Sequence, residues 1–439
     1  MKRVAFYTLG CKLNFSETST IARLFPEKEF EKVDFEASPD IFIINTCSVT
    51  ENADKKCKAL VNKAMRISPH GFVAIIGCYA QLKPEEIAEI PGVDVVLGAN
   101  EKFNILQYLQ TTEKVLKAQI HACEIENVNT FIPSYSFGER TRVFLKIQDG
   151  CDYSCSFCTI PLARGKSRSE SIEKTMHAAQ ELVAETKAKE IVLTGVNTGD
   201  FGRHNGESFF ELIQQLDLLE DLERIRISSI EPNLLSDPII EFAAQSNKFV
   251  PHFHIPLQSG NNKTLKAMRR RYQRELYQEK VEKIKQLLPH ACIGVDVIVG
   301  FPGETTEDFM ETYNFIQALD ISYLHVFTYS ERDNTLAAEL QEIVPAKERA
   351  ERSKMLHTLS EKKKRFFYKT HLGKTLNVLW EAEKEGEFMY GFTDNYIKVR
   401  TLFNNTLVNT IQPFTLNEIN ESGIVVGTMI ESSTFALLQ

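Results

Sequence analysis

The chain has 439 residues, of which 43% are hydrophobic and 25% charged, the balance of a folded protein with about two to three domains. Acidic residues outnumber basic ones by 59 to 51, so the formal charge is −8 and any contact with nucleic acid needs local basic patches. Nine cysteines in so long a chain exclude a disulfide scaffold, and no uncharged apolar run reaches the ~18 residues of a membrane span.

Residues 1–132 alternate apolar strands with helical segments, which predicts a parallel α/β domain. The expected strands are 4–9, 40–45, 72–76 and 93–97, and the expected helices are 16–25 and 52–67. Three of these strands run into a cysteine, namely Cys11, Cys47 and Cys78. Because the carboxyl ends of parallel strands lie at one edge of a sheet, we expect the three thiols to meet there. The alternative is that each cysteine is a small buried hydrophobic residue.

A second cysteine motif follows a polar linker at residues 127–139. The expected strand 143–147 leads to Cys151, Cys155 and Cys158 in a CxxxCxxC spacing. Zinc normally takes about four protein ligands, whereas a [4Fe–4S] cluster held by only three thiolates keeps one iron open for an outside ligand. The spacing therefore favours an iron–sulfur cluster. A zinc site completed by a distant residue, or three ordinary cysteines, is the alternative.

Residues 140–370 continue as strand and helix units. The expected strands are 190–194, 224–229, 252–257, 293–300 and 323–329. Together with the cluster strand they predict an open partial (β/α) barrel, in which chemistry takes place at the carboxyl ends of the strands. A charged helix at 345–374 then ends in a basic run, whose simplest interpretation is a solvated helix face.

Residues 371–439 are rich in short β segments, which predicts a small OB-like barrel. Aromatic residues such as Tyr390 and Tyr396 lie beside Lys398 and Arg400 in this segment. Such a pattern can stack bases and hold phosphates, although the alternation of strand faces places about half of the aromatic rings in the core.

The motifs resemble a known family. CxxxCxxC with Phe157 before its last cysteine resembles the cluster motif of radical S-adenosylmethionine enzymes. GCKLNFSET, NTCSVTENADKK and GCYAQ resemble the amino-terminal domain of methylthiotransferases, a branch of those enzymes. GKTLNVLWE and GFTDNYIKV resemble the TRAM module, an RNA-binding barrel. The resemblance extends over essentially the whole chain in the same domain order. The three expected domains span residues 1–132, 140–370 and 371–439.

The resemblance implies two [4Fe–4S] clusters, an auxiliary one on the cysteines of the first domain and a radical one on CxxxCxxC. It also implies two molecules of S-adenosylmethionine per turnover. One methylates a sulfur at the auxiliary cluster, and the other is cleaved to a 5′-deoxyadenosyl radical. The residues implied in binding S-adenosylmethionine are Phe157, Thr194, Gly195, Asn197, Ser229, Glu231, Gln258, Ser259, Asp296 and Gly300. The residues expected to hold the substrate are Arg164, Lys166, Arg168, Tyr396 and Lys398.

GCKLNFSE and IPLARGKSRS are most similar to the branch that acts on N6-threonylcarbamoyladenosine at position 37 of tRNA. The alternatives are the isopentenyladenosine branch and, third, the branch that modifies a ribosomal protein. A non-catalytic iron–sulfur RNA-binding protein is disfavoured because it needs neither an open iron nor the cofactor motifs. One departure from the family is Asp333-Asn334, where relatives usually have Pro-Gly.

The expected partners are the anticodon loop of tRNA and an electron donor such as a flavodoxin or ferredoxin system. The amino-terminal apolar run is too short for a signal peptide, so we expect a cytoplasmic protein with no membrane partner. Cys57, Cys123 and Cys292 have no partners in a recognisable spacing and are interpreted as structural. The sulfur donor, a general base and the oligomeric state are not identified by the sequence.

Overall fold

The structure is a computed structural model that describes residues 1–47, 51–136 and 141–430. The chain divides into two compact units, the first made of residues 1–137, 144–170 and 330–338 and the second of the remainder. The segment that carries CxxxCxxC thus belongs to the same unit as the amino-terminal sheet. The domain limits expected from the sequence stay a prediction, and residues 137–139 of the expected linker lie outside the described residues.

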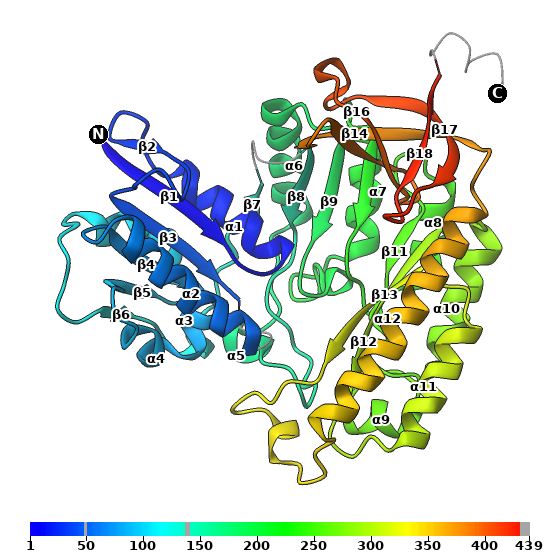
Figure 1. Cartoon of the computed structure of the whole chain (residues 1–439), viewed down its shortest axis with the longest axis horizontal. Helices are drawn as coiled ribbons and strands as arrows, with labels where there is room; N and C mark the ends of the chain where they lie inside the picture. The colour runs from blue at the N-terminus through cyan, green and yellow to red at the C-terminus, as the bar shows by residue number, and fades with distance from the viewer. Residues whose placement is uncertain (48–50, 137–140, 431–439) are drawn as a thin grey trace. The chain divides into compact units, whose positions relative to one another are not determined.

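The first unit is built on a six-stranded sheet in which every neighbouring pair is parallel (Figure 1). Its order is β2 (Phe30–Lys32), β1 (Lys2–Thr8), β3 (Ile41–Thr46), β4 (Phe72–Gly77), β5 (Val95–Leu97) and β6 (Gln119–His121). Helix α1 (Lys12–Arg23) follows β1, and α2 (Glu51–Ile67) follows β3. This arrangement confirms the parallel α/β fold expected from the alternation of strands and helices.

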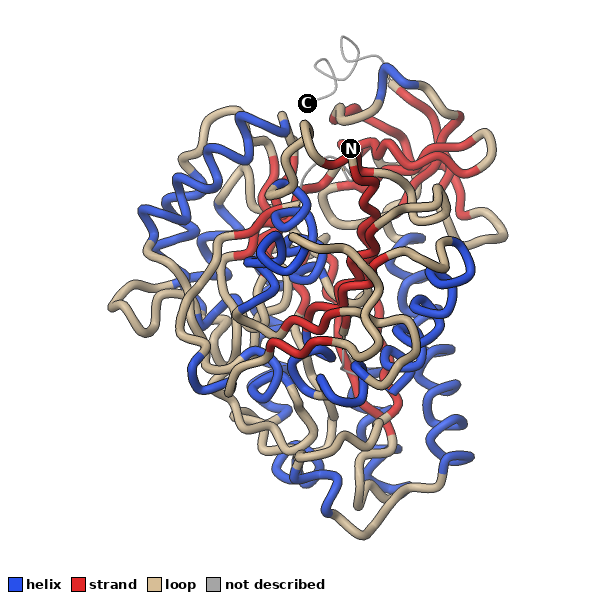
Figure 2. The backbone as a smooth tube through the Cα atoms, turned by 90° about the vertical axis from the view of Figure 1, so that its left-hand side faces the viewer, coloured by secondary structure: helices blue, strands red, loops and turns tan. Residues whose placement is uncertain are grey.

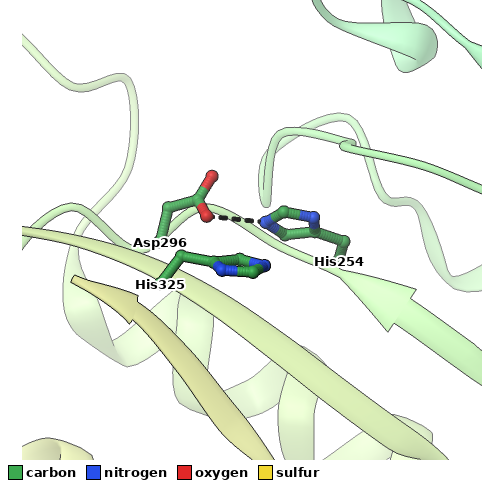
Figure 3. Close-up of side chains that lie close together, drawn as sticks. All are labelled: His254, Asp296 and His325. Carbon is green, nitrogen blue, oxygen red and sulfur yellow. Dashed lines mark hydrogen bonds and ion pairs between the residues drawn. The ribbon is translucent and has the colours of Figure 1, made fainter. Parts of the chain in front are cut away.

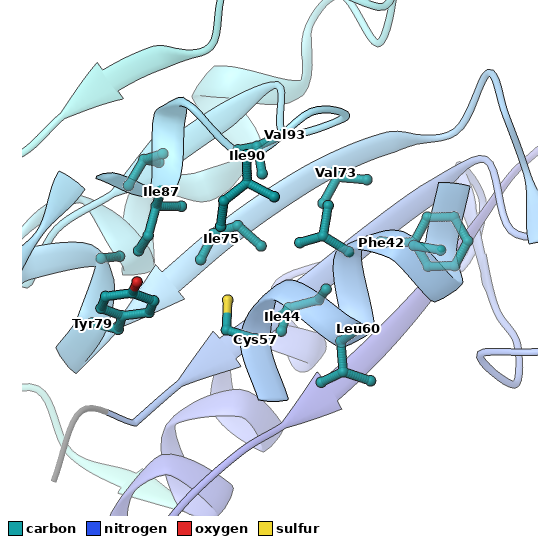
Figure 4. Packing of buried hydrophobic residues seen from close by; sticks show 14 of the residues in the cluster. Phe42, Ile44, Cys57, Leu60, Val73, Ile75, Tyr79, Ile87, Ile90 and Val93 are labelled. Carbon is teal, nitrogen blue, oxygen red and sulfur yellow. The ribbon is translucent and has the colours of Figure 1, made fainter. Parts of the chain in front are cut away.

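Both faces of this sheet are buried because successive side chains of a strand point to opposite sides. On one face Phe42 and Ile44 pack with Cys57 and Leu60 of α2 (Figure 4). On the other face Ile41 and Ile43 belong to a cluster that contains Ile21 of α1. The continuous apolar run of β3 follows from this double coverage.

The second unit contains two groups of parallel strands. The first group is β9 (Glu190–Thr194) and β10 (Arg224–Ile227), and the second is β11 (His252–His254), β12 (Cys292–Val299) and β13 (Tyr323–Thr328). Parallel bridges from Ile225 to Phe249 and from Ser229 to His254 join the groups. The longer helices that alternate with these strands are labelled in Figure 1, and all helices are blue in Figure 2. They are α6 (Ile172–Thr186), α7 (Phe209–Asp217), α8 (Asp237–Gln245), α10 (Arg274–Leu287) and α11 (Thr306–Ala318). The expected partial barrel is confirmed.

The carboxy-terminal part of this unit begins with α12 (Ala346–Lys369). It continues as a closed barrel in the order β14 (Thr375–Glu385), β15 (Phe388–Thr393), β16 (Lys398–Leu402), β18 (Val425–Met429) and β17 (Ile411–Ile419). Trp380 and Phe414 are fully buried in its core and meet edge to face at 5.3 Å between ring centroids. The small carboxy-terminal barrel predicted from the sequence is confirmed. Among the described residues, no helix is both long and apolar enough to cross a membrane.

Candidate active site

The three strand-end cysteines of the first unit lie at one edge of its sheet. Cys11 is the residue before α1, Cys47 follows β3, and Cys78 begins the short helix α3 (Cys78–Leu82) directly after β4. The strands are adjacent, and their paired registers bring their carboxyl ends level. Cys47 also lies against Gly10, because a Cβ added to Gly10 would meet the Cys47 Sγ at 3.1 Å. The three cysteines therefore lie at the same edge of the sheet.

Buried polar side chains hold these cysteine loops together. The Asn14 side-chain amide donates to the carbonyl oxygens of Leu9 at 2.8 Å and Thr46 at 3.0 Å, which joins the loops of Cys11 and Cys47. The Thr46 hydroxyl donates to the Ile76 carbonyl at 2.6 Å, which joins the loop of Cys47 to the strand before Cys78. Hydrogen bonds of this kind fix the positions of ligands before a metal binds.

The CxxxCxxC loop follows β8 (Arg142–Lys146) and closes on itself. The backbones of Asp149 and Arg168 exchange hydrogen bonds of 3.0 and 2.8 Å, and the Cys151 amide donates to the Gly165 carbonyl at 3.0 Å. Gly150 adopts a φ of +72°, and a Cβ there would lie 2.0 Å from the Lys166 carbonyl oxygen. Only glycine fits this close approach.

Backbone amides donate to two of the sulfurs in this loop. The N–H of Tyr153 lies 3.4 Å from the Cys151 Sγ, and the N–H of Ile160 lies 3.4 Å from the Cys158 Sγ. Such donors stabilise a thiolate and, in iron–sulfur proteins, help to set the reduction potential. The sulfurs of Cys151 and Cys158 thus accept backbone hydrogen bonds, and the role of the three cysteines as cluster ligands stays a prediction.

The two cysteine sets are neighbours within the first unit. Helix α5 (Ile160–Arg164), which follows Cys158, packs against α3, which begins at Cys78. The Arg164 guanidinium donates to Asn14 at 2.7 Å, to Glu17 at 3.0 Å and to Asp149 at 2.8 Å. One side chain from the segment after CxxxCxxC thus contacts the helix that follows Cys11.

Arg164 belongs to a buried charge network that the sequence did not predict. Glu17 is wholly buried and also accepts hydrogen bonds from Lys102 at 2.7 Å and Lys146 at 3.1 Å. Burial alone would raise the pKa of the Glu17 carboxyl, but Arg164, Lys102 and Lys146 hold that pKa well below its usual range. Burial would also raise the pKa of the Asp149 carboxyl, but the surrounding cations lower that pKa well below its ordinary value.

Comparison with known proteins places this geometry in a family. Residues 145–316 match the Radical SAM superfamily, and residues 3–98 match the Uncharacterized protein family UPF0004. Threonylcarbamoyladenosine tRNA methylthiotransferase MtaB of Bacillus subtilis (strain 168) is 42% identical over 415 residues, which cover 91% of this chain and 90% of that protein. The chain belongs to the radical S-adenosylmethionine methylthiotransferase family.

Other relatives extend the comparison. The protein of the same name in Aquifex aeolicus (strain VF5) is 39% identical, over 91% of this chain and 96% of that protein. A tRNA-2-methylthio-N(6)-dimethylallyladenosine synthase of Pseudothermotoga lettingae is 31% identical, over 89% of this chain and 90% of that protein. The solved structure of the radical S-adenosylmethionine methyltransferase TsrM from Kitasatospora setae matches with a TM-score of 0.55 and 14% identity, over 77% of each chain, and supports the fold alone.

In this methylthiotransferase-family chain, the residues expected to bind S-adenosylmethionine lie mostly at strand ends of the second unit. Thr194 ends β9, and Gln258, with a φ of +65°, extends the pairing of β11 because its amide donates to the Asp296 carbonyl at 2.8 Å. The Gly300 amide donates to the Glu304 carboxylate at 2.7 Å. The others are Gly195, Asn197, Ser229, Glu231 and Ser259 in this unit, and Phe157 in the first unit. Their role in binding the cofactor stays a prediction.

A group on three strands of the partial barrel contains Asp296, which the sequence pointed to, and two histidines that it did not. His254, Asp296 and His325 come from three adjacent strands, and their side chains point toward one another (Figure 3). The His254 Nε2 lies 2.7 Å from the Asp296 Oδ1. Asp296 on β12 lies opposite His325 on β13 in the register of the two strands. Ligand atoms of the three residues lie within 4.8 Å of one another, so the group can exchange a proton or hold a cation. Alternation on neighbouring strands was the signal that would have found it.

The residues expected to hold the substrate are placed differently from one another. Arg164 is 3% exposed and its donors bind within the protein, and Arg168 donates to Asp149 at 3.1 Å, whereas Lys166 is exposed. Tyr396 stacks on His252 of β11 with 4.4 Å between ring centroids and therefore packs against the partial (β/α) barrel. Lys398 lies over the Tyr390 ring at 4.1 Å. Contact of these residues with substrate stays a prediction.

The remaining cysteines differ in environment. Cys57 and Cys292 are buried, and burial raises the pKa of each thiol to about 12. Cys123 is half-buried, and its backbone carbonyl accepts a hydrogen bond from Gln81 at 2.8 Å. No disulfide joins any of the nine cysteines, all of which lie within the described residues. A structural role for these three cysteines agrees with their surroundings.

Proposed function

We propose that this protein transfers a methylthio group to carbon 2 of N6-threonylcarbamoyladenosine at position 37 of tRNA, using two [4Fe–4S] clusters. The observation that carries the proposal is the presence of both cysteine triplets in one compact unit. Cys11, Cys47 and Cys78 would hold the auxiliary cluster, and Cys151, Cys155 and Cys158 the radical cluster. The 42% identity to a relative named for threonylcarbamoyladenosine supports the choice of substrate.

The chain supplies ligands and positioning for this chemistry. When bound, the radical cluster would supply the electron that cleaves one molecule of S-adenosylmethionine, and the auxiliary cluster would hold the sulfur that receives the methyl group of a second molecule. Three thiolates at each site leave one iron open for an outside ligand. Asn14 holds the loops of the auxiliary site, and the amides of Tyr153 and Ile160 hold two sulfurs of the radical site. An electron donor of the flavodoxin or ferredoxin type and a cytoplasmic setting are part of the proposal.

The substrate assay offers the reconstituted protein two tRNAs under reducing conditions, one carrying threonylcarbamoyladenosine and one carrying isopentenyladenosine. We expect the methylthio nucleoside, detected by mass spectrometry, from the first tRNA. The threonylcarbamoyl group brings polar atoms, and a site built to pair them rejects an apolar analogue by about 10⁴-fold or more. Product from the isopentenyl tRNA alone would assign the chain to that branch, in which relatives are 31% identical.

We expect the carboxy-terminal part of the second unit to hold tRNA. A hollow of 530 Å³ between α12 and the turn before β18 is lined by the exposed residues Lys362 and Arg365 and by Lys364, together with Glu361 and Glu421. Replacing Lys362 and Arg365 by Ala should weaken tRNA binding and reduce the slope of log affinity against log salt by about 1 for each lost phosphate contact. Lys283→Ala, on the surface of α10, is the matched control. An unchanged salt slope in the double variant would contradict this interface.

Gly150→Ala should prevent assembly of the radical cluster. The added methyl group would lie 2.0 Å from the Lys166 carbonyl, and the φ of +72° adds strain of about 1–3 kcal/mol. We expect anaerobic reconstitution to give about half of the iron and sulfide of the unchanged protein. Gly206→Ala is the control, because its φ is +80° but nothing lies within 4 Å of the added Cβ. Full iron content in Gly150→Ala would contradict the placement of a cluster in this loop.

A further inference from the structure

The buried charge network of the first unit contains more positive than negative charge. Its cations are Lys102, Lys146, Arg164 and Arg168, and its carboxylates are Glu17 and Asp149. The side chains are between 0% and 13% exposed. Each cation is paired with Glu17 or Asp149, but four cations against two carboxylates give the network a net charge of +2. Buried charge of this kind is costly unless an anion lies beside it.

The network extends to both cysteine sets. Asn14 accepts a hydrogen bond from Arg164 at 2.7 Å and lies 3.9 Å from the Cys11 Sγ through the same oxygen. On the other side Arg164 ends α5, which begins two residues after Cys158.

Iron–sulfur clusters on these cysteines would be the missing anions. An oxidised [4Fe–4S] core bound by three thiolates carries roughly one net negative charge, and reduction adds one more. Two such clusters therefore match the net charge of +2 of the network. Nearby positive charge stabilises the more negative, reduced state and so raises a reduction potential.

We propose that the Glu17–Arg164–Asp149 network with its three lysine and arginine partners is a shared counter-charge for both clusters, which raises their reduction potentials together. The inference rests on the proposed function, because it requires two clusters. Arg164 acts in it as a positioning residue: it places one positive charge between the two cysteine sets. A neutral side chain of the same size would keep the packing but lose this effect.

An adjoining hollow offers the competing explanation. A cavity of 310 Å³ is lined by Lys102, Lys146, Asp149 and Arg168 of the network and by Glu101 outside it. A small anion bound there would balance the network without coupling it to the clusters. In that case changes in the charge of the network would leave the reduction potentials in place.

The test is a redox titration of the reconstituted protein followed by electron paramagnetic resonance. We expect Arg164→Gln to lower the potentials of both clusters and Glu17→Gln to raise them. Arg164→Lys keeps the charge and should leave the potentials nearly unchanged. The double variant Arg164→Gln/Glu17→Gln restores the net charge and should return both potentials toward those of the unchanged protein. If either single variant fails to hold iron, Lys102→Gln or Asp149→Asn replaces it with the same change of charge.

Shifts that follow the sign of the charge change support the proposal, because a purely structural effect would move both single variants in one direction. Potentials that stay fixed, or that shift alike in the two variants, would overturn it. The iron and sulfide content of the unchanged protein distinguishes failure of this inference from failure of the proposed function. An unchanged protein that assembles only one cluster or none would overturn the proposed function, and with it this inference.

Discussion

Replacing Cys155 by Ala is expected to abolish cleavage of S-adenosylmethionine, whereas replacing Cys47 by Ala should leave that cleavage measurable and abolish methylthio transfer. Cys155 is the middle thiol of the loop that we assign to the radical cluster, and Cys47 lies at the sheet edge that we assign to the auxiliary cluster. Loss of one of three thiolates compromises the cluster that it helps to bind. The measurement is 5′-deoxyadenosine and methylthio nucleoside formed from the same reaction.

The control for this pair is Cys57→Ala, because Cys57 is buried in the core of the first unit and belongs to neither cysteine triplet. It should retain both products, with a loss of stability from the lost contacts of the sulfur. Methylthio product from the Cys47→Ala protein would contradict the role assigned to the first unit. Cleavage by the Cys155→Ala protein would contradict the role assigned to the loop.

Glu17→Ala should strongly destabilise the cluster-free protein. Glu17 is wholly buried and lies within hydrogen-bonding distance of Lys102, Lys146 and Arg164. Its removal leaves these cations without their carboxylate, and breaking a buried ion pair in this way costs about 3–5 kcal/mol. Thermal or urea unfolding measures the loss. Glu36→Ala removes an exposed carboxylate paired with Lys63 and should change stability little.

The stabilisation by Glu17 also has a defined pH dependence. The pKa of its carboxyl is lower in the folded chain than in the unfolded chain, so the unfolded chain binds more protons in acid. The contribution is complete above the ordinary carboxyl pKa of about 4.3 and is lost as the pH falls below it. The difference in unfolding between the unchanged chain and Glu17→Ala should therefore shrink on acidification. A difference independent of pH would contradict the ionised state of Glu17.

Local sequence patterns were sufficient to predict the four central strands of the first sheet and the cysteines at their ends, whereas the short edge strands β2 and β6 were not predicted. The apolar run before Cys78 became β4, and pairing with β3 brought Cys47 to the same edge. The buried network could not be predicted, because Glu17 and Arg164 are 147 positions apart and charged residues are usually exposed. Tyr396 illustrates another limit. Alternation of strand faces does not predict whether an aromatic ring of the small carboxy-terminal barrel packs inside that barrel or against the partial (β/α) barrel, and the Tyr396 ring stacks on His252 of the latter.

The departure at Asp333-Asn334 has a local explanation. Asn334 adopts a φ of +62°, a conformation that asparagine tolerates better than most residues other than glycine. Asp333 forms an ion pair of 2.7 Å with Lys83 in the same unit. The turn is therefore kept by residues other than Pro-Gly, which the sequence alone did not reveal.

The most direct test of the two-cluster function uses S-adenosylmethionine with a deuterated methyl group and tRNA with deuterium at carbon 2 of the threonylcarbamoyladenosine base. We predict that mass spectrometry will find the fully deuterated methyl group in a methylthio substituent on that base, and the carbon 2 deuterium in 5′-deoxyadenosine. Transfer of the methyl group without sulfur, or 5′-deoxyadenosine without the substrate deuterium, would contradict the function proposed for this protein.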